Sequence, residues 1–164
     1  MITHIQGKLI EKTPTYVVID CSGVGYKLNI SLQTYTLVKE ENCKLFTHLS
    51  IKEDAHTLYG FATDHERYIF RNLISVSGVG PATAQVILST YNTEEIVKFI
   101  SSSDVTSIQN VKGIGAKTAQ RIIIDLKDKI SKGSTNPDIL FNLDNTLNDE
   151  ALSALVALGF AKKS

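Results

Sequence analysis

The sequence lacks the features that would place it in a membrane, outside the cell or around a metal. No hydrophobic run is long enough to cross a bilayer, and the first residues have no signal-peptide layout, so we expect a cytoplasmic protein. The two cysteines, Cys21 and Cys43, fit no metal or redox spacing, which favours free thiols in a reducing compartment. The four histidines are scattered along the chain, so no metal-dependent nuclease site is predicted.

The chain also lacks net charge, because 17 basic side chains balance 17 acidic ones. This balance argues against a protein that coats DNA by bulk attraction. The only surplus of positive charge, nine basic against seven acidic residues, falls between residues 63 and 132. Any nucleic-acid surface must therefore be a local patch in that segment.

What the chain does contain is one motif that occurs twice. The 13 residues from Val76 to Leu88 return 35 positions later as Val111 to Ile123, with seven identities. Each copy places an apolar residue and Gly-x-Gly directly before a helical pattern. Such glycines allow a positive φ and a close approach, and the new helix offers unpaired N–H groups and a positive dipole end. Two sites of this kind predict a ligand with repeated phosphates, and an ordinary turn between helices is the alternative.

Cations accompany only the second copy of the motif. Lys117 and Arg121 lie one turn apart near the start of its helix, where a bound phosphate would compensate their position at the positive end of the dipole. The alternative is a solvated face on which Arg121 pairs with Asp125. The matching positions in the first copy are uncharged, so that copy is expected to rely on backbone amides. Neither copy completes a P-loop or a Gly-x-Gly-x-x-Gly motif, so we expect no nucleotide cofactor.

Hydrophobic periodicity predicts an α+β protein of several domains. Residues 1–62 show five short strands, which favour a small barrel of the OB-fold type, with an SH3-like barrel as the alternative. Residues 63–131 predict a compact all-α domain of five helices, the first opened by a capping box of Thr63 and Glu66. Residues 132–147 resemble a flexible linker, and residues 148–164 predict one amphipathic helix followed by a turn.

A tight connection, Lys52 to Ala55, joins the last two predicted strands and lacks the Asn-Gly or Asp-Gly pair that short hairpins favour. Its two central residues are Glu53 and Asp54. A solvated polar turn is the simplest interpretation. The alternative is a negatively charged tip that repels phosphates and shapes the path of a nucleic acid nearby.

The order of barrel, two helix-hairpin-helix motifs, linker and small terminal helix resembles the RuvA family of the bacterial Holliday junction branch migration complex. The resemblance covers essentially the whole chain and rests on Lys52–Ala55 with Leu58–Phe61, Gly78–Pro81, Gly113–Ala119 and Ala154–Gly159. It implies a non-catalytic subunit, a homotetramer or octamer, that holds four-way junctions open and square without sequence specificity in recombination, repair and the SOS response. The implied partners are junction DNA, the hexameric RuvB ATPase and the RuvC resolvase.

The resemblance also implies roles for individual residues. Glu53 and Asp54 become an acidic pin at the centre of the assembly, where they guide strand separation. Contacts with the ATPase fall to four residues near the end of the chain: Leu155, Leu158, Gly159 and Phe160. DNA contacts fall to the two glycine loops and nearby groups: Gly78, Val79, Gly80, Gly113, Ile114, Gly115, Lys117, Thr118, Arg121 and Lys52.

Two features depart from the family pattern. Ala82 stands where the family often has lysine, which predicts weaker phosphate binding by the first motif. Only about one helix of the family's three-helix terminal bundle is present, so we expect assembly and junction binding through residues 1–130 without stimulation of the motor. A repair glycosylase is the enzyme alternative, although Asp125 and Asp128 lie on an ordinary charged helix face. A scaffold that binds duplex DNA generally is the stronger rival.

Overall fold

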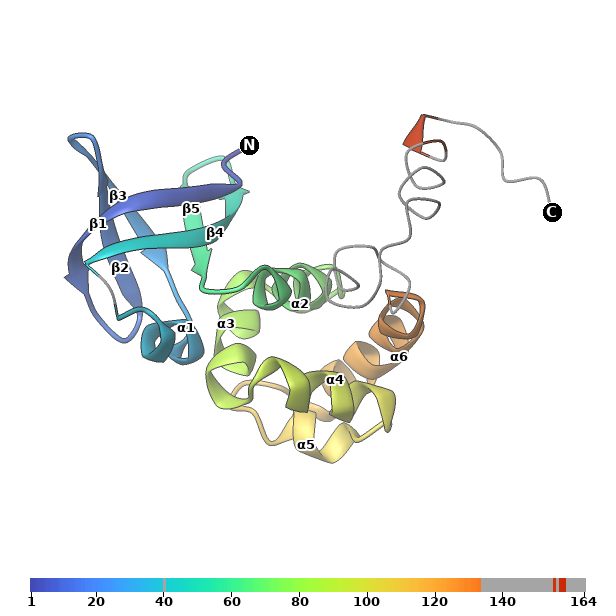
Figure 1. Ribbon diagram of the computed structural model, residues 1–164. Coiled ribbons are helices and arrows are strands. Elements are labelled where there is room, and N and C mark those ends of the chain that lie inside the picture. Colours follow the sequence, from blue (N-terminus) through green and yellow to red (C-terminus); the bar gives the residue numbers. More distant parts are fainter. Residues whose placement is uncertain (40, 134–154, 156, 159–164) are drawn as a thin grey trace. The chain divides into compact units, whose positions relative to one another are not determined.

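The computed structural model describes residues 1–39, 41–133, 155 and 157–158 (Figure 1). The chain divides into two compact units, Met1–Asp128 and Lys129–Ser164. The barrel and the glycine motifs all belong to the first unit. Across the described ranges, no helix is long and apolar enough to cross a membrane.

The first 61 residues form a closed barrel of five strands. The strands are β1 (His4–Lys12), β2 (Tyr16–Cys21), β3 (Val24–Asn29), β4 (Asn42–Ile51) and β5 (His56–Phe61). They follow one another around the barrel in the order β1-β2-β3-β5-β4, and all neighbours are antiparallel except β3 and β5. Alternate residues such as Val17 and Ile19 are fully buried, as a period of two requires. The OB-like barrel predicted from the sequence is therefore confirmed.

A short helix that the sequence analysis did not predict, α1 (Leu32–Leu37), connects β3 to β4. Ser31 caps it by accepting a hydrogen bond from the N–H of Thr34. Six residues are too few to establish a helical period, so periodicity gives no signal for this element.

Within the described residues, five further helices follow the barrel, as predicted. They are α2 (Asp64–Ile74), α3 (Pro81–Thr90), α4 (Thr93–Ser101), α5 (Val105–Gln109) and α6 (Ala116–Gly133). Their apolar faces form one core, whose fully buried members include Leu73, Ala84, Ile87, Ile96, Ile100, Ile108, Ala119, Ile122 and Leu126. The predicted fold class, a barrel followed by an all-α segment, is confirmed for the part of the chain that the structure describes.

The capping box predicted at the start of α2 is only half formed. The Thr63 hydroxyl accepts a hydrogen bond from the N–H of Glu66 at 3.1 Å, but the Glu66 carboxylate is buried and bonds to hydroxyl groups of Ser31 and Thr34 instead. A complete capping box opens α4, where Asn92 and Glu95 each bond to the other's N–H group at 2.8 and 2.9 Å. Local spacing found the helix start but not the role of the Glu66 carboxylate.

Helix α2 packs directly on the barrel through Phe70, which is fully buried. Its ring lies 4.9 Å from that of Phe61, 5.1 Å from that of Tyr59 and 5.5 Å from that of His48, measured between centroids. Aromatic pairs at these separations add attraction beyond the area they bury. The barrel and the first helix after it therefore share one aromatic core.

The predicted boundaries at residues 62, 131 and 147 stay predictions. Helix α6 extends to Gly133, two residues beyond the predicted end of the helical domain. The predicted linker from residue 134 onward and the terminal helix lie outside the described residues, apart from Leu155, Ala157 and Leu158.

Candidate nucleic-acid interface

The two glycine loops have the same geometry. We call Val76–Gly80 loop one and Val111–Gly115 loop two. In each loop the N–H of the fourth residue donates to the carbonyl of the first, at 3.0 Å in loop one and 3.1 Å in loop two. The first glycines, Gly78 and Gly113, have φ values of +91° and +88°, which side chains other than glycine rarely adopt. The repeat predicted from the sequence is therefore also a structural repeat.

The residue between the two glycines anchors each loop. Val79 and Ile114 are each 6% exposed, and their N–H groups make the hydrogen bonds inside the loops. Their side chains fill equivalent places in the helical core. These two predicted DNA-binding residues therefore hold the shape of the loops, since both the side chain and the amide are already engaged within the protein.

The helices that follow the loops begin with N–H groups that have no partner in the described part of the chain. In α3 these are the N–H groups of Gly80, Ala82 and Thr83, while Pro81 has none to offer. In α6 they are the N–H groups of residues 115–118. The first bond within each helix comes only afterwards, from Ala84 to Gly80 at 3.0 Å and from Ala119 to Gly115 at 2.9 Å. Each helix start therefore offers donors to an external anion.

The second glycine of each loop has open space around it. A Cβ atom built on Gly80 or on Gly115 would meet no other atom within 4 Å, and neither residue has a positive φ. Backbone conformation and packing inside the protein therefore do not require glycine at these two positions. The open space allows a ligand to approach the backbone closely.

The predicted cations lie on the exposed side of α6. Lys117 is exposed in the first turn of that helix, and Thr118 beside it is half-buried. Arg121 does not form the alternative ion pair with Asp125 in the described structure; its Nη1 donates instead to the carbonyl of Ser77, at 3.3 Å. Arg121 therefore brings a positive charge to loop one, which has no cation of its own in sequence.

Sequence reasoning missed two groups of the loops. Lys112, directly before Gly113, is exposed, and its equivalent in loop one is Ser77, whose carbonyl accepts the bond from Arg121. The presence of Lys112 inside the repeat was a signal for the first. No local signal indicated the second, because the contact joins residues 44 positions apart.

The connection between β4 and β5 is an exposed two-residue turn. Lys52 donates its N–H to the carbonyl of Ala55 at 2.8 Å, and all four residues from Lys52 to Ala55 are exposed. Neither Glu53 nor Asp54 has a positive φ, so the turn is not of the primed type that hairpins favour. The two carboxylates predicted to form the pin therefore stand side by side at the tip of a hairpin.

Possible metal ligands and the predicted ATPase contacts lie apart from the loops and the tip. Among the residues that the structure describes, no three His, Cys, Asp or Glu side chains lie close enough to hold a metal ion. Of the residues predicted to contact the ATPase, Leu155 and Leu158 are exposed, whereas Gly159 and Phe160 lie outside the described residues.

Comparison with known proteins gives the same two parts. The family model "RuvA N terminal domain" matches residues 1–60, and the model "SAM-like Helix-hairpin-helix tandem" matches residues 70–128. A Holliday junction branch migration complex subunit RuvA of Christiangramia forsetii is 55% identical over 164 residues, covering 99% of this chain and 85% of the relative. The protein of the same name from Flavobacterium psychrophilum is 57% identical over 165 residues, covering 100% and 86%. That of Cytophaga hutchinsonii is 49% identical over 168 residues, covering 99% and 84%. With both parts matched and such relatives over nearly its whole length, the chain belongs to the RuvA family.

Proposed function

We propose that this chain is the non-catalytic DNA-binding subunit of a Holliday junction branch migration complex, and that it holds four-way junctions by their phosphate backbones. One observation carries the proposal: two loops, 35 residues apart, share one geometry, and each begins a helix with N–H groups that have no partner among the described residues. Phosphates repeat along a DNA strand, so a repeated anion site matches a repeated ligand. Amide contacts with phosphates carry no base information, so binding is independent of sequence.

The residues divide the work as follows. The amides of Gly78, Gly80, Gly113 and Gly115 and the helix starts behind them bind phosphates, and Lys117, Thr118 and Lys52 add polar contacts. Val79 and Ile114 hold the loops in shape. Arg121 bridges α6 to loop one, so that one cation serves the hairpin whose own positions, Ala82 and Val86, are uncharged. This arrangement compensates for the alanine at position 82.

The hairpin tip supplies the selectivity of the proposed site. Glu53 and Asp54 repel phosphates from the place where the strands of a junction separate, and their exposure leaves the charges free to act over roughly 10 Å at 0.1 M salt. In this proposal the subunits assemble as a tetramer, or an octamer, so that several tips meet at the centre. The complex works in the cytoplasm with the RuvB ATPase as motor and the RuvC resolvase as the enzyme that cuts the junction.

A competition experiment tests the proposal. A labelled four-way junction bound to the purified chain is challenged with unlabelled junction or with linear duplex of the same arm sequences, at fixed salt concentration. The proposal predicts that the junction competes far better than the duplex and that changing the arm sequences has no effect. Equal competition by linear duplex would support the rival function, a general duplex-binding scaffold.

A further inference from the structure

Two consecutive residues fix the first turn of α2 to the barrel, and we call Glu66 and Arg67 together the α2 lock. Glu66 is fully buried and accepts hydrogen bonds from the hydroxyl groups of Ser31 and, at 2.6 Å, Thr34. Ser31 is also the residue that caps α1. A buried carboxylate needs such partners, because it has lost its water. Glu66 therefore ties α2 to α1.

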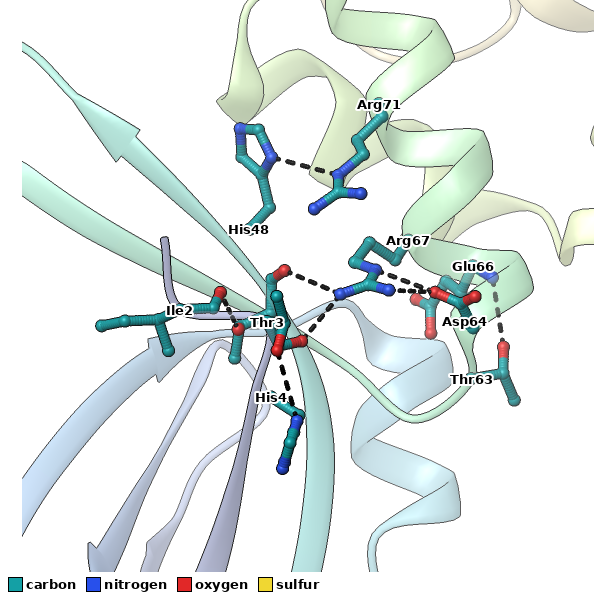
Figure 2. Close-up of polar contacts among 10 residues, drawn as sticks. Ile2, Thr3, His4, His48, Thr63, Asp64, Glu66, Arg67 and Arg71 are labelled. Atoms are coloured by element: carbon teal, nitrogen blue, oxygen red, sulfur yellow. Dashed lines mark hydrogen bonds and ion pairs between the residues drawn. The ribbon is translucent and has the colours of Figure 1, made fainter. Parts of the chain in front are cut away.

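Arg67 ties the same turn to two strands of the barrel. Figure 2 shows its guanidinium between α2 and the strands: Nη1 donates to the carbonyl of Thr3 at 2.7 Å and to that of Thr47 at 3.3 Å. Its Nε donates to Asp64 at 2.8 Å, which completes an ion pair. The guanidinium also lies over the ring of Phe46, 5.3 Å from the centroid. One side chain therefore connects β1, β4 and α2.

The position of the lock relates the hairpin tip to the glycine loops. From Thr47, β4 runs five residues to Lys52 at the tip, about 17 Å of strand. From Arg67, α2 runs nine residues to Val76 at loop one, about 14 Å of helix. A rotation of about 10° at the lock would shift either end by roughly 2 to 3 Å, far more than the few tenths of an ångström that a hydrogen bond tolerates. The lock therefore sets the distance between the tip and the loops.

The clustering of contacts agrees with such a rigid connection. The barrel and the helices up to Asp128 form one compact unit, although they match two separate family models. The fully buried Phe70, one turn further along α2, adds the aromatic contacts with the barrel.

We propose that Arg67 and Glu66 are positioning residues that give the protein its preference for four-way junctions over linear duplex. The proposal rests on the function proposed above. A linear duplex can be held by the glycine loops alone, whereas a junction must meet the loops and the acidic tip at the same time. Holding both in the required geometry before binding removes an ordering cost that only the junction complex would otherwise carry.

The test compares two variants of the same helix. Arg67→Met keeps the length and apolar stem of the side chain but removes every polar contact of the guanidinium. Arg71→Met is the matched control, because Arg71 lies one turn later and its side chain makes one hydrogen bond within the described residues, from its Nε to His48 Nδ1 at 3.4 Å (Figure 2). Asp64→Asn is a milder variant that weakens the ion pair of Arg67 while an amide oxygen still orients the guanidinium.

The measured quantity is the ratio of junction affinity to duplex affinity, with oligomer size checked by light scattering. Arg67→Met is expected to lower junction affinity about 10-fold and to change duplex affinity less than about 2-fold. Asp64→Asn should shift the ratio in the same direction by less, and Arg71→Met should leave it unchanged. A merely structural role for Arg67 would lower both affinities together, in proportion to the unfolded fraction.

Two outcomes would overturn the inference. In folded Arg67→Met, an unchanged ratio would show that the lock does not set the preference. If Arg67→Met fails to fold, an unchanged ratio in Asp64→Asn leads to the same conclusion. A wild-type protein without any preference for junctions would instead refute the proposed function itself, and the inference with it, so the two failures are distinguishable.

Discussion

Adding a single methyl group at chosen glycines separates the two reasons for which a loop can require glycine. Gly113 has a φ of +88°, so Gly113→Ala strains the backbone. Gly115 has open space around it and no positive φ, so Gly115→Ala places a Cβ atom only where a ligand would approach. Gly23, in the turn between β2 and β3, has a φ of +91° and open surroundings. Gly23→Ala therefore provides the strain without the proposed DNA contact.

The expected magnitudes differ enough to be separated. An L-residue in the left-handed region costs roughly 1 to 2 kcal/mol, which should lower the free energy of unfolding of Gly113→Ala and Gly23→Ala. For Gly115→Ala, alanine is a poorer helix cap than glycine but restricts the unfolded chain, so the net change should be less than about 1 kcal/mol. Loss of one hydrogen bond to a charged phosphate costs about 1.5 to 3 kcal/mol, or roughly 10- to 150-fold in Kd.

The assays are denaturant unfolding for stability and fluorescence anisotropy of a labelled junction for affinity, at one salt concentration. Gly115→Ala should bind weakly at near-normal stability, and Gly23→Ala should bind normally at reduced stability. Gly113→Ala should lose both. A stable Gly115→Ala with wild-type affinity would refute the reasoning, because it would show that no phosphate comes close to that backbone.

Three further predictions follow from individual side chains. Arg121→Gln should reduce the slope of log K against log salt concentration by about 1, whereas Lys8→Gln, on the barrel and ion-paired with Glu41, should not; an unchanged slope in Arg121→Gln removes it from the phosphate contacts. Glu53→Gln with Asp54→Asn should tighten binding to linear duplex and reduce the junction preference, because charges that repel phosphates are lost; weaker duplex binding in a titration would contradict the pin. Burial raises the pKa of Glu66 above its ordinary value of 4.5 despite the hydroxyl bonds, so folding favours the protonated form. Relative to Glu66→Gln, the wild type should therefore lose stability as the pH rises above about 4.5, which melting curves at several pH values would detect.

The parts of the fold that repeat or alternate could be predicted from the sequence. The loops could be located because Val76–Leu88 and Val111–Ile123 resemble each other, and a repeat places equivalent residues in equivalent surroundings. The strands followed from a period of two, and the long helices from their apolar stripes and caps. In each case the signal lies within about a dozen consecutive residues.

The parts that depend on distant contacts could not be predicted. The spacing from Thr63 to Glu66 indicated a capping box, but the carboxylate bonds instead to hydroxyl groups more than 30 residues earlier. The i,i+4 spacing of Arg121 and Asp125 allowed a local ion pair, but the guanidinium reaches Ser77 in the other loop. Helix α1 is too short for a period and is held by the same buried carboxylate. Local spacing limits the partners a side chain could choose, and tertiary packing decides among them.

The central claim is that both loops bind phosphates through their backbone N–H groups, and amide NMR of the 15N-labelled protein tests it most directly. On addition of a four-way junction, the amide signals of Gly80, Ala82 and Thr83 and those of residues 115–118 should shift together. The amide of Gly23, on the barrel, should not shift with them. Shifts confined to one loop, or to side-chain signals of Lys117 and Arg121 while the backbone signals stay in place, would contradict the account.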